Sequence, residues 1–532
     1  MAQFPDVNVL IKDNTNLPTE KKFTKFFGAQ GITALGEIDK PVFISNWKEY
    51  QKYFGGYVAG SLFPKILKRA LDGGAKGYIV RRGHYTDVAD KTTLAGTKAT
   101  ITLTVSSDSA VFTAKAVGAG YNGITVKVSA AASGQANKVD ILVTWVVTVQ
   151  ITPSETKTET FTSLVKNVSE NPGATEKAQV NGKLMHVNIG TVTNKIPVGT
   201  VTLASGAQVI ADIVDADYNG DQSQQTGWFA FDSQAKIVRF FNLDRPSPAV
   251  DIALKDYVES RGKSRFHIRT PMGIPIEEIQ EYREGGGSTY THVGINSLYG
   301  SIWAGDLIVD DPEYPNNPLT IPAIGDVCAA YAKKDTQGEW FSAARKESGR
   351  ITGQDVLGVV KNFFNSSLRD LAAVAYETGV NFVIEHDNDE IGFTLWGNRS
   401  LFKDTEKVSS KENIADMMVF MKREMKAKIE MEHFQPNDPV SWRTIYSNVK
   451  PIIRTLEKGR AIIEGEGENW HWKGDQNIGK ITDLTPDNVN NIADVQAGKY
   501  RVLFLFKPIA STEFVVFEIV PTNADVVINI LN

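Results

Sequence analysis

Two short stretches carry residue types that could do chemistry, and each lacks one element of its site. The stretch SRGKS, residues 260–264, ends like a phosphate-binding loop, which needs a glycine five positions before its last glycine. Tyr257 holds that position, so we do not expect nucleotide binding there. The stretch DNDEIG, residues 387–392, is similar to a calcium loop, but Ile391 offers no oxygen at the fifth position. It fits a hairpin turn better.

The remaining reactive side chains are isolated. Cys328 is the only cysteine and lies in the apolar run IGDVCAAYA, so we expect a small buried hydrophobe rather than a catalytic thiol. The seven histidines are scattered, and no two have the spacing of a zinc-binding helix. Glu277 and Glu278 are adjacent and point to different sides of a helix or strand, which makes a poor acid–base pair. We therefore predict no catalytic residues, no cofactor, no metal site and no enzyme activity.

Length and composition bound the class of protein. A chain of 532 residues exceeds the roughly 250–300 that one core supports, so we expect several domains. The net charge of −5 argues against a dedicated nucleic-acid binder, and one cysteine excludes an internal disulfide framework. The start MAQFPDVNVL lacks the pattern of a signal peptide, and no apolar run reaches ~18 residues. We expect a protein made in a reducing compartment and not inserted in a membrane.

Residues 21–90 together with 206–400 predict a discontinuous α/β domain. The strand KPVFIS precedes a helix whose Trp47, Tyr50 and Phe54 share one face. A second helix, SLFPKILKRALDGG, ends at a glycine pair and precedes the strand AKGYIVRR. Strand, helix, helix and strand in this order indicate an α/β layer.

Residues 91–205 have a different pattern. The stretches ATITLTV, GITVKV and VDILV alternate apolar and polar residues with a period of two, between turns rich in Gly, Asn and Ser. This pattern predicts a mostly β domain inserted into the α/β domain.

Residues 401–510 predict a second α/β domain with two long helices. The first, NIADMMVFMKREMKAKIEME, carries methionines at helical spacing, which we interpret as a core face rather than a binding groove. It also carries Lys422, Arg423 and Lys426. These cations form either a solvated basic face or a positive stripe for an acidic partner. The second helix, NDPVSWRTIYSNVKPIIRTLEKG, begins with an Asp-Pro pair suited to an N-terminus.

Both ends of the chain, residues 1–20 and 511–532, contain apolar runs that read as strands. A strand edge left unpaired is a template for another chain, so each end folds back or joins the sheet of a neighbouring molecule. If different neighbours accept the two ends, each copy is linked to several others. The residues that we expect to be exchanged are Val7, Val9, Ile11, Phe514, Val516, Val526, Ile528 and Ile530.

Six stretches in one order resemble a known family. They are PVFISNWKEYQKYFGG with LFPKILKRALDGGAKGYIVRR, AVGAGYNGITVKV, DADYNGDQSQQTGWFAFD, IPAIGDVCAAYAKKDTQGEWFSAA, FTLWGNRSL and ASTEFVVFEI. Together they resemble the contractile tail sheath proteins of bacteriophages and related injection machines. The departures are Trp228 where the family usually has an aliphatic residue, Ser400 for threonine, and the order Gly-Tyr-Asn-Gly before GITVKV.

The resemblance implies a structural subunit that forms hexameric rings stacked helically around an inner tail tube. Exchanged terminal strands link the subunits, and contraction from a metastable extended state drives the tube through the target envelope without ATP. The implied partners are other copies of the chain, the inner tube protein, and baseplate and tail terminator proteins. The implied location is the virion tail, assembled in the cytoplasm of the host bacterium. The helix with Lys422, Arg423 and Lys426 is our candidate for the tube-facing surface.

The expected fold class is α+β and multidomain. It combines α/β sandwich core domains, an inserted mostly β outer domain, and extended N- and C-terminal strand-exchange arms. Three alternatives remain: the sheath of a non-phage contractile injection particle, a polysaccharide-acting enzyme with a β insert, and a secreted adhesion module.

Overall fold

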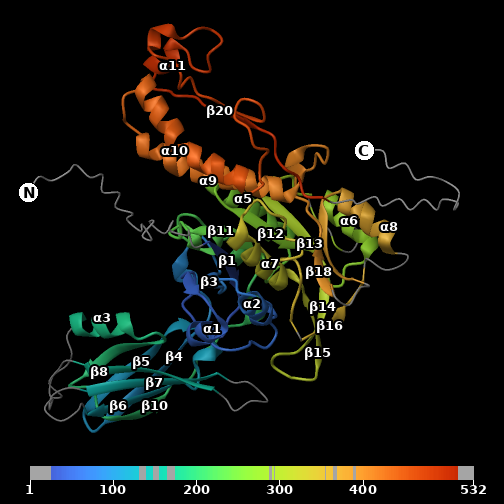
Figure 1. Ribbon diagram of the computed structural model, residues 1–532. Coiled ribbons are helices and arrows are strands. Elements are labelled where there is room, and N and C mark those ends of the chain that lie inside the picture. The colour runs from blue at the N-terminus through green and yellow to red at the C-terminus, as the bar shows by residue number, and fades with distance from the viewer. Residues whose placement is uncertain are drawn as a thin grey trace, which may run out of the picture.

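Three parts follow one another through the molecule (Figure 1): a β-rich part at one end, an α/β body, and a layer of long helices at the other end. This computed structural model describes residues 25–130, 139–147, 155–164, 174–286, 290, 292, 294–353, 355–362, 368–386 and 391–512. The expected exchange residues at both ends of the chain lie outside these ranges.

The body is built on a mixed eight-stranded sheet in the order β18-β17-β13-β12-β11-β1-β3-β2. Neighbours from β17 to β3 run parallel, and the outer strands β18 and β2 are antiparallel to theirs. The strands are β1 Phe26–Gly31, β2 Val42–Ile44, β3 Gly77–Arg81, β11 Ile237–Phe241, β12 Arg265–Arg269, β13 Gly300–Ala304, β17 Val380–Glu385 and β18 Phe393–Trp396.

Helices cover both faces of this sheet because successive strand residues point to opposite sides. Phe241 packs into one core with α1, α2 and α7, while its neighbour Phe240 packs into the other with α5, α6 and α8. The helices are α1 Trp47–Phe54, α2 Phe63–Asp72, α4 Asp215–Asn219, α5 Pro248–Arg261, α6 Ile276–Glu284, α7 Ile324–Gln337 and α8 Arg369–Glu377. The body is therefore a three-layer α/β sandwich.

Local sequence explains where the first helix begins and ends. The side chain of Asn46 accepts a hydrogen bond from the backbone N–H of Glu49 at 2.9 Å, which caps α1. Gly55 ends the helix with φ +80°, a conformation that suits glycine. Tyr50 and Phe54 are fully buried, as their spacing predicts.

A small antiparallel sheet flanks the body. It has the order β15-β14-β16, with β14 Asp306–Asp310, β15 Pro318–Pro322 and β16 Val356–Val359. Its inner residues Leu307, Val309 and Ile321 join the core that contains α2 and α7.

The β-rich part consists of two antiparallel sheets, β4-β5-β9 and β10-β6-β7-β8, around one apolar core. The elements are β4 Lys98–Val105, β5 Asp108–Val117, β6 Thr125–Ala130, β7 Val139–Val147, β8 Glu155–Leu164, α3 Ala174–Lys183, β9 Val187–Thr193 and β10 Gly199–Thr202. The alternation in Ile141 and Val143 places both side chains inside, as expected for period-two strands. We call this part the insert.

The last part, residues 412–506, contains α9 Glu412–Ile429, α10 Pro439–Lys458, α11 Ile492–Gln496, β19 Trp470–Lys473 and β20 Leu503–Phe506. Asp438 caps α10 through the backbone N–H groups of Val440 and Ser441, and the helix continues through Pro451. Met417 and Met421 are buried in the core between α9 and α10, which confirms the core interpretation of the methionines. We call this part the C-terminal layer. The mixed α+β fold with small additional sheets agrees with the expected class; the arms lie outside the described residues.

Short 3₁₀ helices connect these elements. They are η1 Lys91–Thr93, η2 Ala119–Tyr121, η3 Ile210–Asp212, η4 Gly227–Phe231, η6 Val408–Ser410, η7 Glu430–Glu432 and η8 Ile481–Asp483.

Candidate functional site

Of the reactive stretches considered from the sequence, residues 387–390 of DNDEIG lie outside the described residues. Cys328 is buried in the core of the body, and burial raises the pKa of its thiol well above the ordinary value. No group of three or more His, Cys, Asp or Glu side chains in the described ranges is arranged to hold a metal ion. No described helix combines the length and apolar composition of a membrane-spanning segment.

The feature that most resembles a binding site is the two-stranded sheet β19–β20, which we call the ribbon. Its strands pair antiparallel from Trp470 opposite Phe506 to Lys473 opposite Leu503. Lys507 donates to the carbonyl of Asn469 at 3.0 Å, and hydrogen-bonded pairs alternate along an antiparallel ladder. The N–H and C=O groups of Leu505 and Leu503 therefore also point toward β19.

It follows that the backbone groups of Phe504 and Phe506 point to the other side of β20. No described residue makes a backbone hydrogen bond to them from that side. The corresponding edge of β19 is partly closed, because Trp470 bonds to Gly465 and Gly467. Within the described chain, β20 thus presents an open edge to which another strand can add.

The two faces of the ribbon differ. Phe504 and Phe506 pack toward the core of the C-terminal layer, with the Phe504 ring 6.0 Å from Trp470. Leu503 and Leu505 face outward and are 47% and 42% exposed. Exposed leucines beside an open edge give an added strand apolar surface to bury. A two-stranded ribbon is marginal by itself, so packing on α9 and α10 stabilises it.

Both segments that lead to the chain ends lie against α9. The Nζ of Lys25 forms an ion pair with Glu339 at 2.8 Å and lies over the ring of Phe420 on α9. Near the other end, Ile509 donates to the carbonyl of Ala461, and Asn413 donates to the carbonyl of Ile509. The C-terminal layer therefore holds the described beginning and end of the chain.

The three cations predicted to face a partner lie differently on α9. Lys426 is 69% exposed and pairs with Glu430 one turn further on. Lys422 is exposed and donates to the hydroxyl of Tyr299 at 2.8 Å. Arg423 is only 16% exposed, because its guanidinium pairs with Glu339 at 2.6 Å.

Glu339 connects two separate elements. It pairs with Arg423 on α9 and with Lys25 before β1. Burial opposes ionisation of this carboxyl, but Arg423 and Lys25 together lower its pKa to about 2.

A buried group of charges joins α9 to the central sheet. Asp416 forms ion pairs with Arg239 of β11 at 3.0 Å, with Arg265 of β12 at 3.1 Å, and with Lys334 of α7. Burial alone would raise the pKa of Asp416, but the three cations lower it far below its usual range. The group, which we call the charged joint, consists of Arg239, Arg265, Lys334, Asp335, Glu412 and Asp416.

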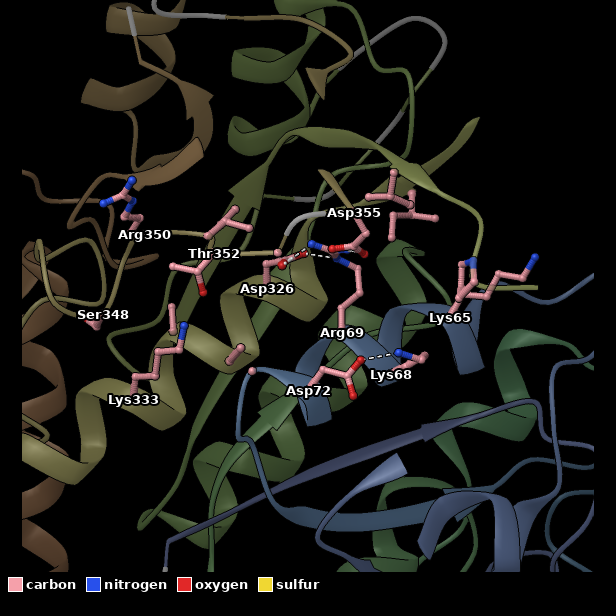
Figure 2. Close-up of a pocket in the computed structure, with 18 residues that line it drawn as sticks. Lys65, Lys68, Arg69, Asp72, Asp326, Lys333, Ser348, Arg350, Thr352 and Asp355 are labelled. Carbon is pink, nitrogen blue, oxygen red and sulfur yellow. Dashed lines mark hydrogen bonds and ion pairs between the residues drawn. The ribbon is translucent and has the colours of Figure 1, made fainter. Parts of the chain in front are cut away.

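A cavity of about 160 Å³ lies between α2, α7 and residues 348–355 (Figure 2). At its centre, Arg69 bonds to both oxygens of Asp326, at 2.7 and 2.8 Å, and also pairs with Asp355. Lys333 and Arg350 line the cavity without an ion pair to any described residue. No pattern in the sequence predicts this cavity.

The charged joint was also not predicted from the sequence, although a signal for it exists. Arg239 and Arg265 stand in the short strands IVRFF and RFHIR, and Asp416 stands in the apolar run IADMM. A charge inside an apolar element is rarely buried without a partner, so these positions could have been marked as members of buried pairs.

Neither a protein-family model nor a curated protein sequence matches this chain. Solved structures do. The sheath tail protein of Listeria innocua has a TM-score of 0.57 at 12% identity, over 91% of this chain and 95% of that chain. The sheath tail protein of Desulfitobacterium hafniense has a TM-score of 0.53 at 13% identity, over 91% and 96%.

A chain of the anti-feeding prophage baseplate in its contracted state also matches, with a TM-score of 0.53 at 11% identity. That match covers 98% of this chain and 99% of the other. The fold of this chain is therefore the fold of tail sheath proteins over most of its length.

Proposed function

We propose that this chain is the structural subunit of a contractile tail sheath, and that copies are linked by strands added to the ribbon. The observation that carries the proposal is the open edge of β20, in a chain whose fold matches sheath tail proteins along more than nine tenths of its length. Copies stack as hexameric rings around an inner tube, with a baseplate at one end and a terminator at the other. No catalytic step or nucleotide is required.

The ribbon accepts terminal strands from other copies. Phe504 and Phe506 offer two N–H and two C=O groups on the open side. Each hydrogen bond formed there contributes about 0.5–1.5 kcal/mol net. Burial of Leu503 and Leu505 under the added strand contributes further, at roughly 25 cal/mol per Å² of apolar surface. A link of several kcal/mol keeps copies connected while their bodies rotate.

The charged joint transmits force from the ribbon to the body. A link between copies does mechanical work only if the layer that holds it moves together with the sheet. Asp416 binds three cations from β11, β12 and α7, so α9 is fixed to the sheet in one orientation. Contraction itself draws on contacts between globular parts, because the strand links are kept in both states.

We also propose that α9 faces the inner tube. Lys422 and Lys426 supply the exposed positive charge. Arg423 instead ties the helix to the body through its ion pair with Glu339. The Lys422→Glu/Lys426→Glu variant should still polymerise but lose affinity for an acidic tube surface, more so at low salt than at high salt. Cosedimentation with tubes at 50 and 500 mM NaCl measures this. Unchanged binding at 50 mM NaCl contradicts the assignment.

The proposed division of the chain follows the same scheme. Residues 1–20 and 511–532 are the exchanged arms, with Val7, Val9, Ile11, Phe514, Val516, Val526, Ile528 and Ile530 as their pairing residues. Residues 21–90 with 206–400, 91–205 and 401–510 are the middle, outer and inner domains.

The main test is assembly of the chain expressed alone. Negative-stain microscopy should show long hollow tubes. Deleting residues 1–15, or everything after Thr512, should leave folded monomers that form none. Tubes from either truncated chain would show that strand exchange is not the link.

A matched pair of proline variants tests the ribbon itself. Phe504→Pro removes an N–H from the open edge and leaves the ladder to β19, so it should abolish polymerisation. Because it also deletes a ring that packs against Trp470, Phe504→Leu is its packing control and should still polymerise. Leu505→Pro removes an N–H that bonds within the ribbon, so it should also disorder the layer. Circular dichroism and sedimentation velocity separate the two effects.

The sheath belongs either to a phage tail or to an injection particle without a capsid. The match to the anti-feeding prophage chain favours an injection particle, and the matches to bacterial sheath tail proteins fit a phage tail equally. Purified particles decide between them, since only a phage virion carries a DNA-filled capsid above the sheath.

A further inference from the structure

The cavity beside Arg69 has an excess of positive charge. Five cations line it, namely Lys65, Lys68, Arg69, Lys333 and Arg350, against three carboxylates, Asp72, Asp326 and Asp355. Lys65 has partners of its own in Asp311 and Glu313. Lys68 pairs with Asp72, and Arg69 satisfies Asp326 and Asp355. Lys333 and Arg350 are therefore the cations on this lining that lack an ionic partner among the described residues.

The position of these two cations leaves space for a carboxylate. In Figure 2, Lys333 and Thr352 lie on the same side of Arg69, and Arg350 lies further out on that side. The lining also includes the apolar residues Ile321, Ala329 and Ile351. The volume of about 160 Å³ is large enough for several waters. A carboxylate attached to a slim apolar segment fits this combination of charge, lining and size.

The chain itself contains such a segment at the ribbon. Residues 463–468, IEGEGE, form an exposed turn that leads directly into β19. Gly465 and Gly467 have φ of +126° and +85°, and they keep the turn narrow because they add no side chains between the glutamates. Glu466 pairs with Lys450, whereas Glu464 and Glu468 are exposed and have no ion pair to a described residue.

We propose that the Lys333–Arg350 side of the cavity receives the acidic turn of a second copy, with Glu464 and Glu468 as the paired carboxylates. The inference rests on the proposed function, because it needs copies in contact. The turn continues into the ribbon, so a copy whose ribbon holds a neighbour's strand already presents this turn at its surface. Ile463, 42% exposed, covers the apolar lining when the turn docks.

The contact links different parts of two copies. One copy contributes its α/β body, through Lys333 of α7 and Arg350 before β16, and the other contributes its C-terminal layer. Such a body-to-layer contact is independent of the strand links, which join layer to arm. It is also reversible, since partly exposed ion pairs are screened by salt within about 10 Å at 0.1 M.

A charge swap tests the pairing. Lys333→Glu/Arg350→Glu and Glu464→Lys/Glu468→Lys should each raise the critical concentration for tube formation at least tenfold. The chain with all four changes should return to within about threefold of the unchanged chain, because opposite charges face each other again. The control for Lys333→Glu/Arg350→Glu is Lys98→Glu/Lys127→Glu, which makes the same change in net charge on exposed strands of the insert. It should leave assembly unaltered.

Two outcomes would contradict docking of the acidic turn in the cavity. If the four-fold variant assembles no better than either double variant, the two sites do not meet. If Lys333→Glu/Arg350→Glu assembles like the control, the cavity is not an interface. Melting temperatures within a few degrees of the unchanged chain confirm that the variants fold, which is expected because the changed side chains are at least partly exposed.

If the chain forms no tubes, that result counts against the proposed function. A binding measurement then tests the docking of the turn by itself. The peptide AIIEGEGENWH, residues 461–471, should bind the full chain below its critical concentration and weaken at least fivefold with Lys333→Glu/Arg350→Glu. The Glu464→Lys/Glu468→Lys peptide should not bind. If succinate binds and the peptide does not, the cavity is a small-anion site, and docking of the turn is wrong.

Discussion

The insert and the C-terminal layer are attached to the same body in opposite ways. The insert has a large apolar core, which Leu35 of the body joins, and it also meets the body through hydrogen bonds to backbone carbonyls. The C-terminal layer has a smaller core, which Trp340 of the body joins, and it meets the body through the charged joint and the Arg423–Glu339 pair. The part with the stronger core therefore has the less charged attachment.

Three side chains form hydrogen bonds to backbone carbonyls at the attachment of the insert. Arg81 donates to the carbonyls of Gly36 and Val117, at 2.9 and 2.8 Å. Tyr121 donates to the carbonyl of Gly36 at 3.0 Å, and His186 donates to that of Lys52 at 2.9 Å. These bonds satisfy buried carbonyls, and each is modest in net energy.

The comparison suggests different tasks for the two attachments. Buried ion pairs add little net stability over apolar packing, but losing one partner is costly, so they fix one arrangement against others. We infer that the layer with the proposed links between copies needs a fixed orientation to the sheet. The insert, which has no part in the proposed links, needs only to stay attached.

The largest expected effect comes from breaking the charged joint. Asp416→Asn leaves Arg239, Arg265 and Lys334 without their shared carboxylate, and should lower the free energy of unfolding by about 3–5 kcal/mol. Urea denaturation followed by tryptophan fluorescence measures this. Asp256→Asn, at a largely exposed carboxylate paired with Lys255, is the control and should cost below about 1 kcal/mol. Equal losses in the two variants contradict a special role for the joint.

An effect of intermediate size should be the pH dependence of stability that comes from His186 in the attachment of the insert. Burial lowers the pKa of His186 to about 4, so the folded chain keeps it neutral while the unfolded chain binds a proton below about 6.5. Its contribution to stability is complete above pH 6.5 and is lost as the pH falls toward 4. Between pH 7.5 and 5.0, the unchanged chain should lose on the order of 2 kcal/mol more than His186→Asn. Calorimetry at the two pH values measures it, and parallel losses would contradict it.

A smaller effect isolates one hydrogen-bonding group of the insert attachment. Tyr121→Phe removes a buried hydroxyl that donates to the Gly36 carbonyl and accepts from the Gly36 N–H. The cost should be about 1–2 kcal/mol. Tyr53→Phe is the matched change, because no hydrogen bond of the Tyr53 hydroxyl is found among the described residues, and it should be close to neutral. Thermal melting of both variants tests the difference, which must favour Tyr53→Phe.

The smallest effect on stability should accompany the clearest effect on assembly. Leu505→Lys changes an exposed ribbon residue, and Val105→Lys changes a similarly exposed residue of the insert, 46% against 42%. Each should alter the free energy of unfolding by less than about 0.5 kcal/mol. Leu505→Lys alone should abolish polymerisation, because a charge beside an open edge blocks strand addition. Sedimentation assays with equal results for both would remove the ribbon from the mechanism.

Much of the local structure follows from the sequence. The period of Trp47, Tyr50 and Phe54 predicted α1, and α1 buries Tyr50 and Phe54. The alternating stretches predicted the insert strands, and β7 buries Ile141 and Val143. These predictions succeed because a helix or strand repeats its buried face at a fixed spacing that adjacent residues already display.

The candidate site was less accessible to the same reasoning. KYRVLFLFKP is recognisable as a strand, but whether its edge is paired depends on which strands lie beside it. Lys422, Arg423 and Lys426 look equivalent along the helix, yet Arg423 turns to Glu339, 84 residues away in sequence. Helical spacing gives the face of a side chain and not the element that covers it.

The sequence by itself determined the elements, the faces they bury and the lack of a recognisable catalytic motif. Only the tertiary structure decided that Asp416 meets Arg239 across 177 residues, that Lys333 and Arg350 border one cavity, and that β20 keeps an open edge. The physical reason is the separation along the chain of the residues that produce each feature. Periodicity arises from neighbours along the chain, whereas ion pairs, cavities and strand edges arise where distant segments meet.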